Sequence, residues 1–261
     1  MRSDSYTFIF AMAVCIVCSV LLAICASSLK PYQERNMAIE KKKNILMSLS
    51  LCDASGKMSS DDVEKVYKEK ITEKVVSKTG QEMSGKTIVE IAGDDQYLGL
   101  YQRTDNGAIA IPIQGMGLWD MIKGYLALEK DGRTVNGITF YEQMETAGLG
   151  AEIVKPSFTN TFIGKDILNS DGKLVSITVA KGKASDMSGV DLKNAVDGIS
   201  GATMTCRFVS GFVKSGLKTY QPVLKTMWSQ STAPEPAIPI IEKPTEELNK
   251  DIEKMEAGNN G

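Results

Sequence analysis

The pattern of apolar and polar residues begins with a long uncharged run near the N-terminus. Residues 6–29 are mainly apolar, enough to span the roughly 30 Å hydrocarbon core of a bilayer. A cleaved signal peptide is the competing interpretation, with a small-residue cleavage site near Ala26, but Arg2 is offset by a nearby acid in the region where such a peptide needs positive charge. We predict an uncleaved single-pass membrane anchor over residues 1–29, which Pro31 and the adjoining charges end.

A mainly polar stretch with helical periodicity follows the anchor. Residues 33–50 carry apolar side chains at helical spacing toward their end, which predicts a helix leaving the membrane. Ser59 precedes a run of acids, the pattern of a helix start, and the apolar face of this second helix extends from Val63 to Ile71. We predict that residues 30–85 form a helical connector or insertion.

Short runs with a period of two residues begin near position 86. Turns rich in glycine, asparagine and aspartate separate them, and this hairpin-like spacing predicts an antiparallel sheet. The candidate strands are residues 87–91, 97–103, 108–112, 125–129, 137–143 and 174–179. Beyond them, Val209, Phe212 and Val213 recur at the spacing of an amphipathic helix, which would cover one face. The prediction is an α+β fold, in which an N-terminal transmembrane helix precedes an antiparallel-sheet domain over residues 86–228 with packed helices.

The C-terminal part of the chain loses this periodicity after Tyr220. Prolines are frequent there and are followed by a charged stretch and a glycine- and asparagine-rich end. This composition favours a disordered tail over residues 229–261, with a short helix over residues 245–256.

Composition narrows the chemistry. The chain has 30 basic and 32 acidic residues, so it lacks the basic excess typical of nucleic-acid binding. It contains no histidine, which excludes Ser-His-Asp and Cys-His mechanisms. Of its five cysteines, three lie in the apolar N-terminal run; a disulfide between Cys52 and Cys206 stays open, although nothing in their spacing argues for it.

The stretch from Asp197 to Thr205, Asp-Gly-Ile-Ser-Gly-Ala-Thr-Met-Thr, lies directly before the amphipathic helix. A helix N-terminus presents unpaired N–H groups and a positive dipole end to an anion. Gly201 and Ala202 leave room for a phosphate near the backbone, and Thr205 supplies a hydroxyl that a phosphate can esterify. The simpler alternative is a glycine turn followed by a helix that Thr203 caps.

This stretch resembles the flavinylation motif of the FMN-binding domain family, which occurs in the C subunit of the Na+-translocating NADH:quinone reductase (Nqr) and in the G subunit of the related Rnf complex. The resemblance implies FMN covalently bound as a phosphoester to Thr205. Ser200 and Thr203 would then bind phosphate oxygens. Asp197 would bind a metal or orient the threonine during attachment by a separate flavin transferase.

Two further loops resemble the same family. Gly117-Leu118-Trp119 ends a Gly-x-Gly-Leu-Trp loop that lies at the flavin in that family; alone, it would be a turn with one core tryptophan. Residues 145–150, Glu-Thr-Ala-Gly-Leu-Gly, resemble a loop that wraps the flavin ring and ribityl chain. By this match Glu145 and Thr146 offer polar contacts, Gly148 shapes the loop and Leu149 packs on the ring.

The loop departs from the family pattern at two positions, and the choice between two lysines stays open. Ala147 replaces the usual proline, and Gln143 stands where a histidine is frequent, which affects the fine shape of the loop. Lys181 or Lys183, after the last predicted strand, would face the flavin phosphate or the reduced ring. A solvated lysine is the plain alternative.

The resemblance implies an electron-relay subunit rather than a complete enzyme. The chain has no FAD or NAD fingerprint and no cysteine quartet for an Fe–S cluster, so its partners would be the other membrane, flavin and Fe–S subunits of an Nqr complex. The long segment before the sheet and the complete Gly-x-Gly-Leu-Trp loop favour the C subunit of Nqr. The G subunit of Rnf and a non-redox membrane-anchored assembly or binding protein are the alternatives.

The expected location is the bacterial inner membrane. Lys30, Arg35 and the triplet at residues 41–43 follow the anchor, so the positive-inside rule would place the domain in the cytoplasm, although large domains also translocate regardless of charge. The family resemblance implies a periplasmic domain, and we follow it.

Overall fold

The computed structural model describes residues 4–52, 58–91 and 93–231. The chain divides into two units, Met1–Trp228 and Ser229–Gly261, and the elements discussed below belong to the first, apart from the last residues of α4. In chain order the elements are α1 (Asp4–Ser48), α2 (Ser60–Lys70), β1 (Ile71–Ser77), β2 (Tyr97–Arg103), β3 (Ile109–Met116), β4 (Met121–Leu128), β5 (Val135–Glu142), the 3-10 turn η1 (Gly150–Val154), α3 (Pro156–Thr159), η2 (Asn160–Phe162), β6 (Thr178–Val179), η3 (Ala184–Asp186), η4 (Leu192–Asn194), β7 (Ala195–Val196) and α4 (Thr203–Ser231). Beyond Ser231, the predicted tail and its helix over residues 245–256 lie outside the described residues.

The first part of α1 is long and apolar enough to cross a membrane. An 18-residue window of it has a mean hydropathy of 3.0, and none of that window is buried. Full exposure distinguishes it from the core helix of a soluble domain, so it fits a membrane anchor. We predicted that the anchor ends near Pro31, but the helix continues to Ser48 with the proline inside it. A proline removes one backbone hydrogen bond, which the turns on either side can tolerate.

The C-terminal turn of α1 is attached to the sheet. Ile45 and Leu49 are buried there. The hydroxyl of Thr139 on β5 donates to the carbonyl of Asn44 at 3.1 Å, and Nη1 of Arg103 on β2 donates to the carbonyl of Leu49 at 2.9 Å. These two bonds join the end of α1 to β2 and β5.

Strands β1 to β5 form one antiparallel sheet in which sequence neighbours pair. β3 and β4 pair in register over eight residue pairs, and the register between β4 and β5 shifts beside Gly124. A β-carbon at Gly124 would lie 2.0 Å from the carbonyl oxygen of Thr139, so glycine permits this irregularity. The predicted antiparallel α+β fold is confirmed.

Alternate residues of each central strand face opposite layers, as expected for a period of two. On β3, Ile109, Ile111 and Ile113 belong to the core cluster that also contains residues of α4. Just before and within the same strand, Ala108 and Ala110 pack instead with α1 and α2. Both faces of the sheet are therefore covered by helices.

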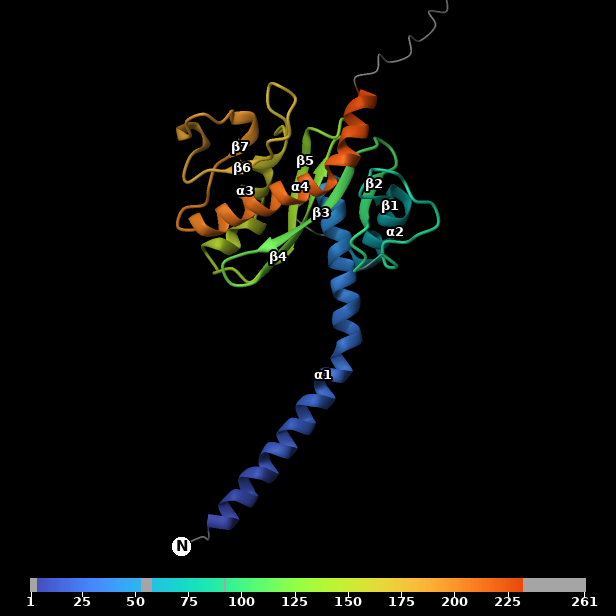
Figure 1. Ribbon diagram of the computed structural model, residues 1–261. Coiled ribbons are helices and arrows are strands. Elements are labelled where there is room, and N and C mark those ends of the chain that lie inside the picture. Colours follow the sequence, from blue (N-terminus) through green and yellow to red (C-terminus); the bar gives the residue numbers. More distant parts are fainter. Residues whose placement is uncertain (1–3, 53–57, 92, 232–261) are drawn as a thin grey trace, which may run out of the picture. The chain divides into compact units, whose positions relative to one another are not determined.

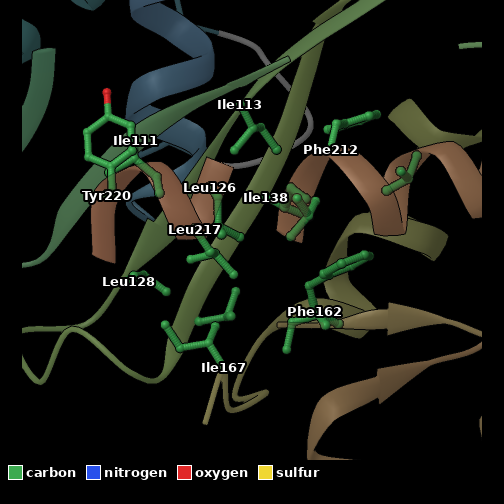
Figure 2. Close-up of a cluster of buried hydrophobic side chains, with 14 of the residues drawn as sticks. Ile111, Ile113, Leu126, Leu128, Ile138, Phe162, Ile167, Phe212, Leu217 and Tyr220 are labelled. Carbon is green, nitrogen blue, oxygen red and sulfur yellow. The ribbon is translucent and has the colours of Figure 1, made fainter. Parts of the chain in front are cut away.

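Helix α4 covers one face, as its apolar period predicted. Figure 1 shows it crossing the strands, and Figure 2 shows Phe212, Leu217 and Tyr220 among the aliphatic side chains of the sheet. The hydroxyl of Tyr220 also donates to the carbonyl of Gly99 on β2 at 2.6 Å. Because α4 is held along its length, its first turn has a fixed position relative to the strands.

A separate parallel pair, β6 and β7, leads into the start of α4. β7 ends at Val196, and Asp197 follows directly. The sequence predicted one strand over residues 174–179, but only its last two residues form β6. Ser176 has a positive φ of 78°, and its N–H and that of Val175 both donate to the carbonyl of Ile167, which breaks the extended conformation.

Two predictions for residues 71–91 were also wrong. The second helix ends at Lys70, and residues 71–77, expected within a helical insertion, form β1, which pairs along its whole length with β2. Residues 87–91, expected as a strand, form turns. Thr87 and Glu90 exchange hydrogen bonds between side chain and backbone, the reciprocal pattern of a capping box, and this holds the segment in a helical turn.

The packing of α4 makes a testable prediction. Leu217→Ala is expected to lower the free energy of unfolding by about 2–5 kcal/mol, because it empties a fully buried position beneath the helix. Lys218→Ala, at the exposed neighbouring position, should stay within about 0.5 kcal/mol of wild type. Guanidinium unfolding of the full chain in detergent, followed by tryptophan fluorescence, measures both. Equal values for the two variants would contradict this packing.

Candidate functional site

Three segments meet around a small cavity at the same end of β3, β4 and β5. They are the turn between β3 and β4, the loop after β5 and the start of α4. The cavity has a volume of about 160 Å³ and is lined by Leu118, Glu145, Thr146, Leu149, Gly150, Gly201, Ala202, Thr203, Met204 and Thr205. Pockets that enclose a drug-sized ligand have volumes of at least roughly 300 Å³, so this smaller cavity matches a phosphate and part of an adjoining chain.

Glu145 is a buried carboxylate at the centre of the site, with 7% of its surface exposed. Its Oε1 accepts hydrogen bonds from the backbone N–H groups of Leu118 at 2.8 Å and Trp119 at 3.3 Å. The side chain of Gln143 accepts the backbone N–H of Glu145 at 2.6 Å, which holds the start of the loop. The turn between β3 and β4 is thus joined to the loop after β5 through one carboxylate.

Thr205 lies in the first turn of α4 and is 2% exposed. Its Oγ1 donates to Oε2 of Glu145 at 2.5 Å. A buried hydroxyl and a buried carboxylate satisfy each other here, which avoids the cost of leaving either without a partner. Sixty residues separate the two in sequence, and their contact brings the second and third segments together.

Glycines give this pair its space. A β-carbon at Gly150 would lie 2.5 Å from Oγ1 of Thr205 and 2.7 Å from Oε2 of Glu145. A β-carbon at Gly117 would lie 2.5 Å from Oε1 of the same carboxylate. Gly201 has a φ of +77°, a left-handed conformation that glycine adopts without strain. The backbone therefore approaches the pair more closely than any other residue would allow.

The start of α4 suits a phosphate. Ala202 donates its N–H to Ile199, and the N–H of Cys206 is the donor to Ala202 at 3.0 Å. The N–H groups between them, at residues 203–205, are first-turn donors that have no acceptor within a helix. Three of the lining residues therefore offer donors at the positive end of a 29-residue helix, and a hydroxyl of Thr205 lies beside them.

An apolar rim borders the cavity. Leu118 is 49% exposed, Trp119 is 68% exposed and Leu149 is 42% exposed. The indole Nε1 of Trp119 donates to Oγ1 of Thr146 at 3.2 Å, so the exposed ring has a fixed partner across the two loops. A flat aromatic ligand could cover this rim while its phosphate enters the cavity.

Most of the residues predicted from the three motifs meet in or beside this cavity. Gly117 is buried against Glu145, and Trp119 contacts Thr146. Ser200 is exposed immediately before Gly201, and Gly148, with φ +75°, is exposed in the loop. These last two shape or border the segments but do not line the cavity.

Two predicted residues lie elsewhere. Oδ1 of Asp197 accepts the backbone N–H of Ala184 at 2.7 Å, and Asp197 lines a different cavity together with Lys183. Lys181 is exposed in the segment 180–182 that lies against Gly198. Neither side chain is among the described residues that line the cavity at Thr205.

Gly150 and Met204 line the cavity but were not predicted as site residues. Gly150 closes the Glu-Thr-Ala-Gly-Leu-Gly loop, so its place in the motif was an available signal. Met204 is the variable position of the flavinylation motif and gave none. The neighbouring Cys206 is buried and accepts the N–H of Ile199, and burial raises the pKa of its thiol. It therefore packs as a neutral side chain at neutral pH.

Gly150→Ala tests the tight approach at the site. The added methyl should separate Thr205 from Glu145 and lower the free energy of unfolding by about 1–3 kcal/mol, through crowding and the loss of a buried hydrogen bond. Gly211→Ala, on α4 with open space around it, is the control and should leave the free energy unchanged or raise it. Denaturant unfolding of the full chain measures both, and a neutral Gly150→Ala would contradict the geometry.

Comparison with known proteins agrees with this arrangement. Residues 117–218 match the family model described as FMN-binding domain. The C subunit of the Na+-translocating NADH-quinone reductase of Neisseria meningitidis serogroup A is 33% identical, with 87% of this chain and 97% of that protein covered. The corresponding protein of Haemophilus ducreyi is 32% identical, with 81% and 89% covered.

Solved structures give the same result. A crystal structure of the corresponding protein from Parabacteroides distasonis is 32% identical, with a TM-score of 0.64 over 75% of this chain and 96% of that one. NqrC of Shewanella oneidensis, 21% identical with a TM-score of 0.61 over 76% and 99%, shares the fold. The chain therefore belongs to the NqrC family, that of the C subunit of the Na+-translocating NADH-quinone reductase.

Proposed function

We propose that this chain is the membrane-anchored, FMN-carrying electron relay of a Na+-translocating NADH:quinone reductase. The observation that carries the proposal is the cavity at the start of α4, where Thr205, first-turn donors and glycines meet within the part of the chain that matches the FMN-binding domain. The name of the full-length relatives supplies the complex. Bound FMN supplies the ability to carry one or two electrons, and the protein positions it.

Thr205 is the attachment point in this proposal. Its hydroxyl faces the cavity and would form a phosphoester with FMN. The N–H groups at residues 203–205 would bind the phosphate oxygens through charge-assisted hydrogen bonds. The hydroxyl of Thr203, which also lines the cavity, would add one more. A covalent link keeps the cofactor in place where free flavin is scarce.

The flavin ring would lie outside the cavity, because 160 Å³ does not enclose a whole FMN. The exposed rim of Leu118, Trp119 and Leu149 offers it an apolar surface. An uncovered ring edge also suits a relay, since electrons must enter and leave through contacts with other subunits. Asp197 and Lys181 lie away from this cavity, and any part they play would come during attachment or docking rather than in holding the phosphate.

The partners follow from what the chain lacks. Its sequence has no NAD or FAD fingerprint, so NADH oxidation and quinone reduction would belong to the other membrane, flavin and Fe–S subunits. A flavin transferase would act once, during maturation. The G subunit of Rnf is not favoured, because the relatives that match most of the chain are NqrC proteins. A non-redox assembly or binding role would predict no bound flavin.

Thr205→Val is the decisive variant. We expect wild-type protein from the native host, or co-expressed with a flavin transferase, to fluoresce as a flavoprotein in a denaturing gel. The valine variant should be dark, since it lacks the hydroxyl that forms the ester. Thr219→Val, which removes an exposed threonine hydroxyl of the same helix outside the cavity, should still fluoresce. A fluorescent Thr205→Val band, or a dark wild type beside an active transferase, would contradict covalent attachment at this residue.

The same variant tests the relay. A complex assembled with Thr205→Val should lose most NADH-driven quinone reduction if electrons pass through this flavin. A complex with Thr219→Val, changed outside the cavity, should retain it. Normal quinone reduction by a Thr205→Val complex that contains no flavin on this protein would remove the relay function while leaving the family assignment intact.

For the anchor, we propose a single pass through the bacterial inner membrane with the domain in the periplasm. Asp171 lies in an exposed turn far from the cavity in sequence and is a suitable place for a reporter cysteine.

The orientation predicts the labelling of an Asp171→Cys variant. A membrane-impermeant maleimide should label it in intact cells whose outer membrane has been made permeable. Wild type supplies the background: three of its cysteines lie in the apolar part of α1, Cys206 is buried and Cys52 is half-buried. Labelling that appears only after lysis would place the domain in the cytoplasm, in agreement with the positive charges that follow the anchor.

A further inference from the structure

The hydroxyl of Thr205 differs in direction from three other hydroxyls of α4. Those of Ser210, Thr219 and Thr226 donate to the carbonyl four residues earlier, at 3.0, 3.1 and 3.3 Å. This bond to the preceding turn is the usual one for a helical serine or threonine. Thr205 instead donates across the cavity to Glu145, from a different segment of the chain.

The carboxylate that receives this hydrogen bond is held in a fixed orientation. Two backbone N–H groups of the turn between β3 and β4, those of Leu118 and Trp119, bind its Oε1 and leave Oε2 for the threonine. Gly150 and Gly117 leave room for both oxygens. Only 7% of Glu145 is exposed, so the carboxylate has little water to compete with the hydroxyl.

We propose that Glu145 is the general base for attachment of the flavin phosphate to Thr205. The proposal rests on the proposed function of Thr205 as the attachment point. It makes the chain a participant in its own modification: the transferase would supply the activated flavin, and the acceptor domain would supply the base.

The reaction balances without an oxidant. An ester cannot form readily from a free phosphate, so the donor is a flavin phosphoanhydride such as FAD, bound by the transferase. The bond from phosphorus to the bridging anhydride oxygen breaks, and a bond from phosphorus to Oγ1 of Thr205 forms. A nucleoside monophosphate leaves with the electron pair of the broken bond. The proton of Oγ1 passes to Oε2 of Glu145 and then to solvent.

A carboxylate suits this role because it lies within hydrogen-bond distance of the proton that must leave. In protein kinases, an aspartate likewise accepts the proton of the substrate hydroxyl during phosphoryl transfer. A positioned general base typically contributes about 10²–10⁴-fold to a rate. The alternative is a structural bond that only holds the loop against α4, and the two roles differ in what a glutamine at this position would do.

Glu145→Gln separates them. Its amide oxygen can still accept the N–H groups of Leu118 and Trp119, and its NH₂ can bond Oγ1, but it cannot take a proton. Glu145→Asp keeps the carboxylate on a shorter side chain and provides a second test if the glutamine variant is destabilised. Glu142→Gln, at an exposed acid that pairs with Lys123 outside the cavity, is the matched control.

The experiment follows the attachment reaction itself. Each full-length protein, in detergent and free of flavin, is incubated with FAD and the purified flavin transferase, and intact-mass spectrometry measures the fraction that carries FMN over time. Unfolding midpoints show that each variant is folded. We expect Glu145→Gln to react at least about 100-fold more slowly than wild type, Glu145→Asp to react faster than the glutamine variant, and Glu142→Gln to match wild type.

The outcomes are distinct. A folded Glu145→Gln that reacts at the wild-type rate would overturn the proposal and leave Thr205 as the attachment point. Glutamine and aspartate variants that are folded and equally slow would overturn it too, because the carboxylate would then not matter. A wild-type chain that gains no FMN, while the transferase modifies another acceptor, would overturn the proposed function itself.

Discussion

The packing of α4 on the sheet is the interaction on which the site depends. Side chains such as Phe212 and Leu217 bury one stripe of the helix against isoleucines and leucines of β3 and β4 (Figure 2). A helix held in this way cannot slide or rotate without losing buried apolar contact. Its first turn therefore stays at the end of the strands, where the turn after β3 and the loop after β5 also lie. The position of Thr205 follows from a hydrophobic contact that begins a few residues further along the same helix.

Glycines and backbone N–H groups form much of the site around Thr205. Glycines stand where a side chain would collide with the carboxylate or the hydroxyl, and the donors aimed at the cavity are N–H groups of a helix turn. Backbone donors keep their positions when side chains change rotamer, which suits the proposed phosphate site. Such a site needs no histidine, which this chain lacks. The electron chemistry belongs to the flavin, and the protein contributes the shape of the site, hydrogen-bond donors and one carboxylate.

The sequence predicted those parts of the fold that local pattern determines. The period of α4 and the strand β2 follow from spacing alone. The three glycine-containing motifs follow from the family resemblance, and the structure brings them together. The sequence did not predict β1, because Ile71 and its neighbours suit either a helix face or a strand. The pairing with β2 decides between the two. The turn at Thr87 was missed although a capping box was present, since the apolar residues inside it imitate a strand. The bond between Glu145 and Thr205 joins residues sixty positions apart, and no local signal contains it.

The sheet also separates the end of the anchor helix α1, on one face, from α4, on the other. Successive residues of one strand point to opposite layers: Ile111 packs in the cluster that contains α4, and Ala110 packs in the cluster that contains the end of α1. The small alanines on the second face let the end of the α1 helix approach, and the larger isoleucines on the first fill the space under α4. A single strand sequence thus packs against α1 on one face and α4 on the other without one layer disturbing the other. Because the end of α1 is also hydrogen-bonded to β2 and β5, the anchor and the site are joined through the same strands, and a relay built this way holds its cofactor on a body that is itself attached to the membrane helix.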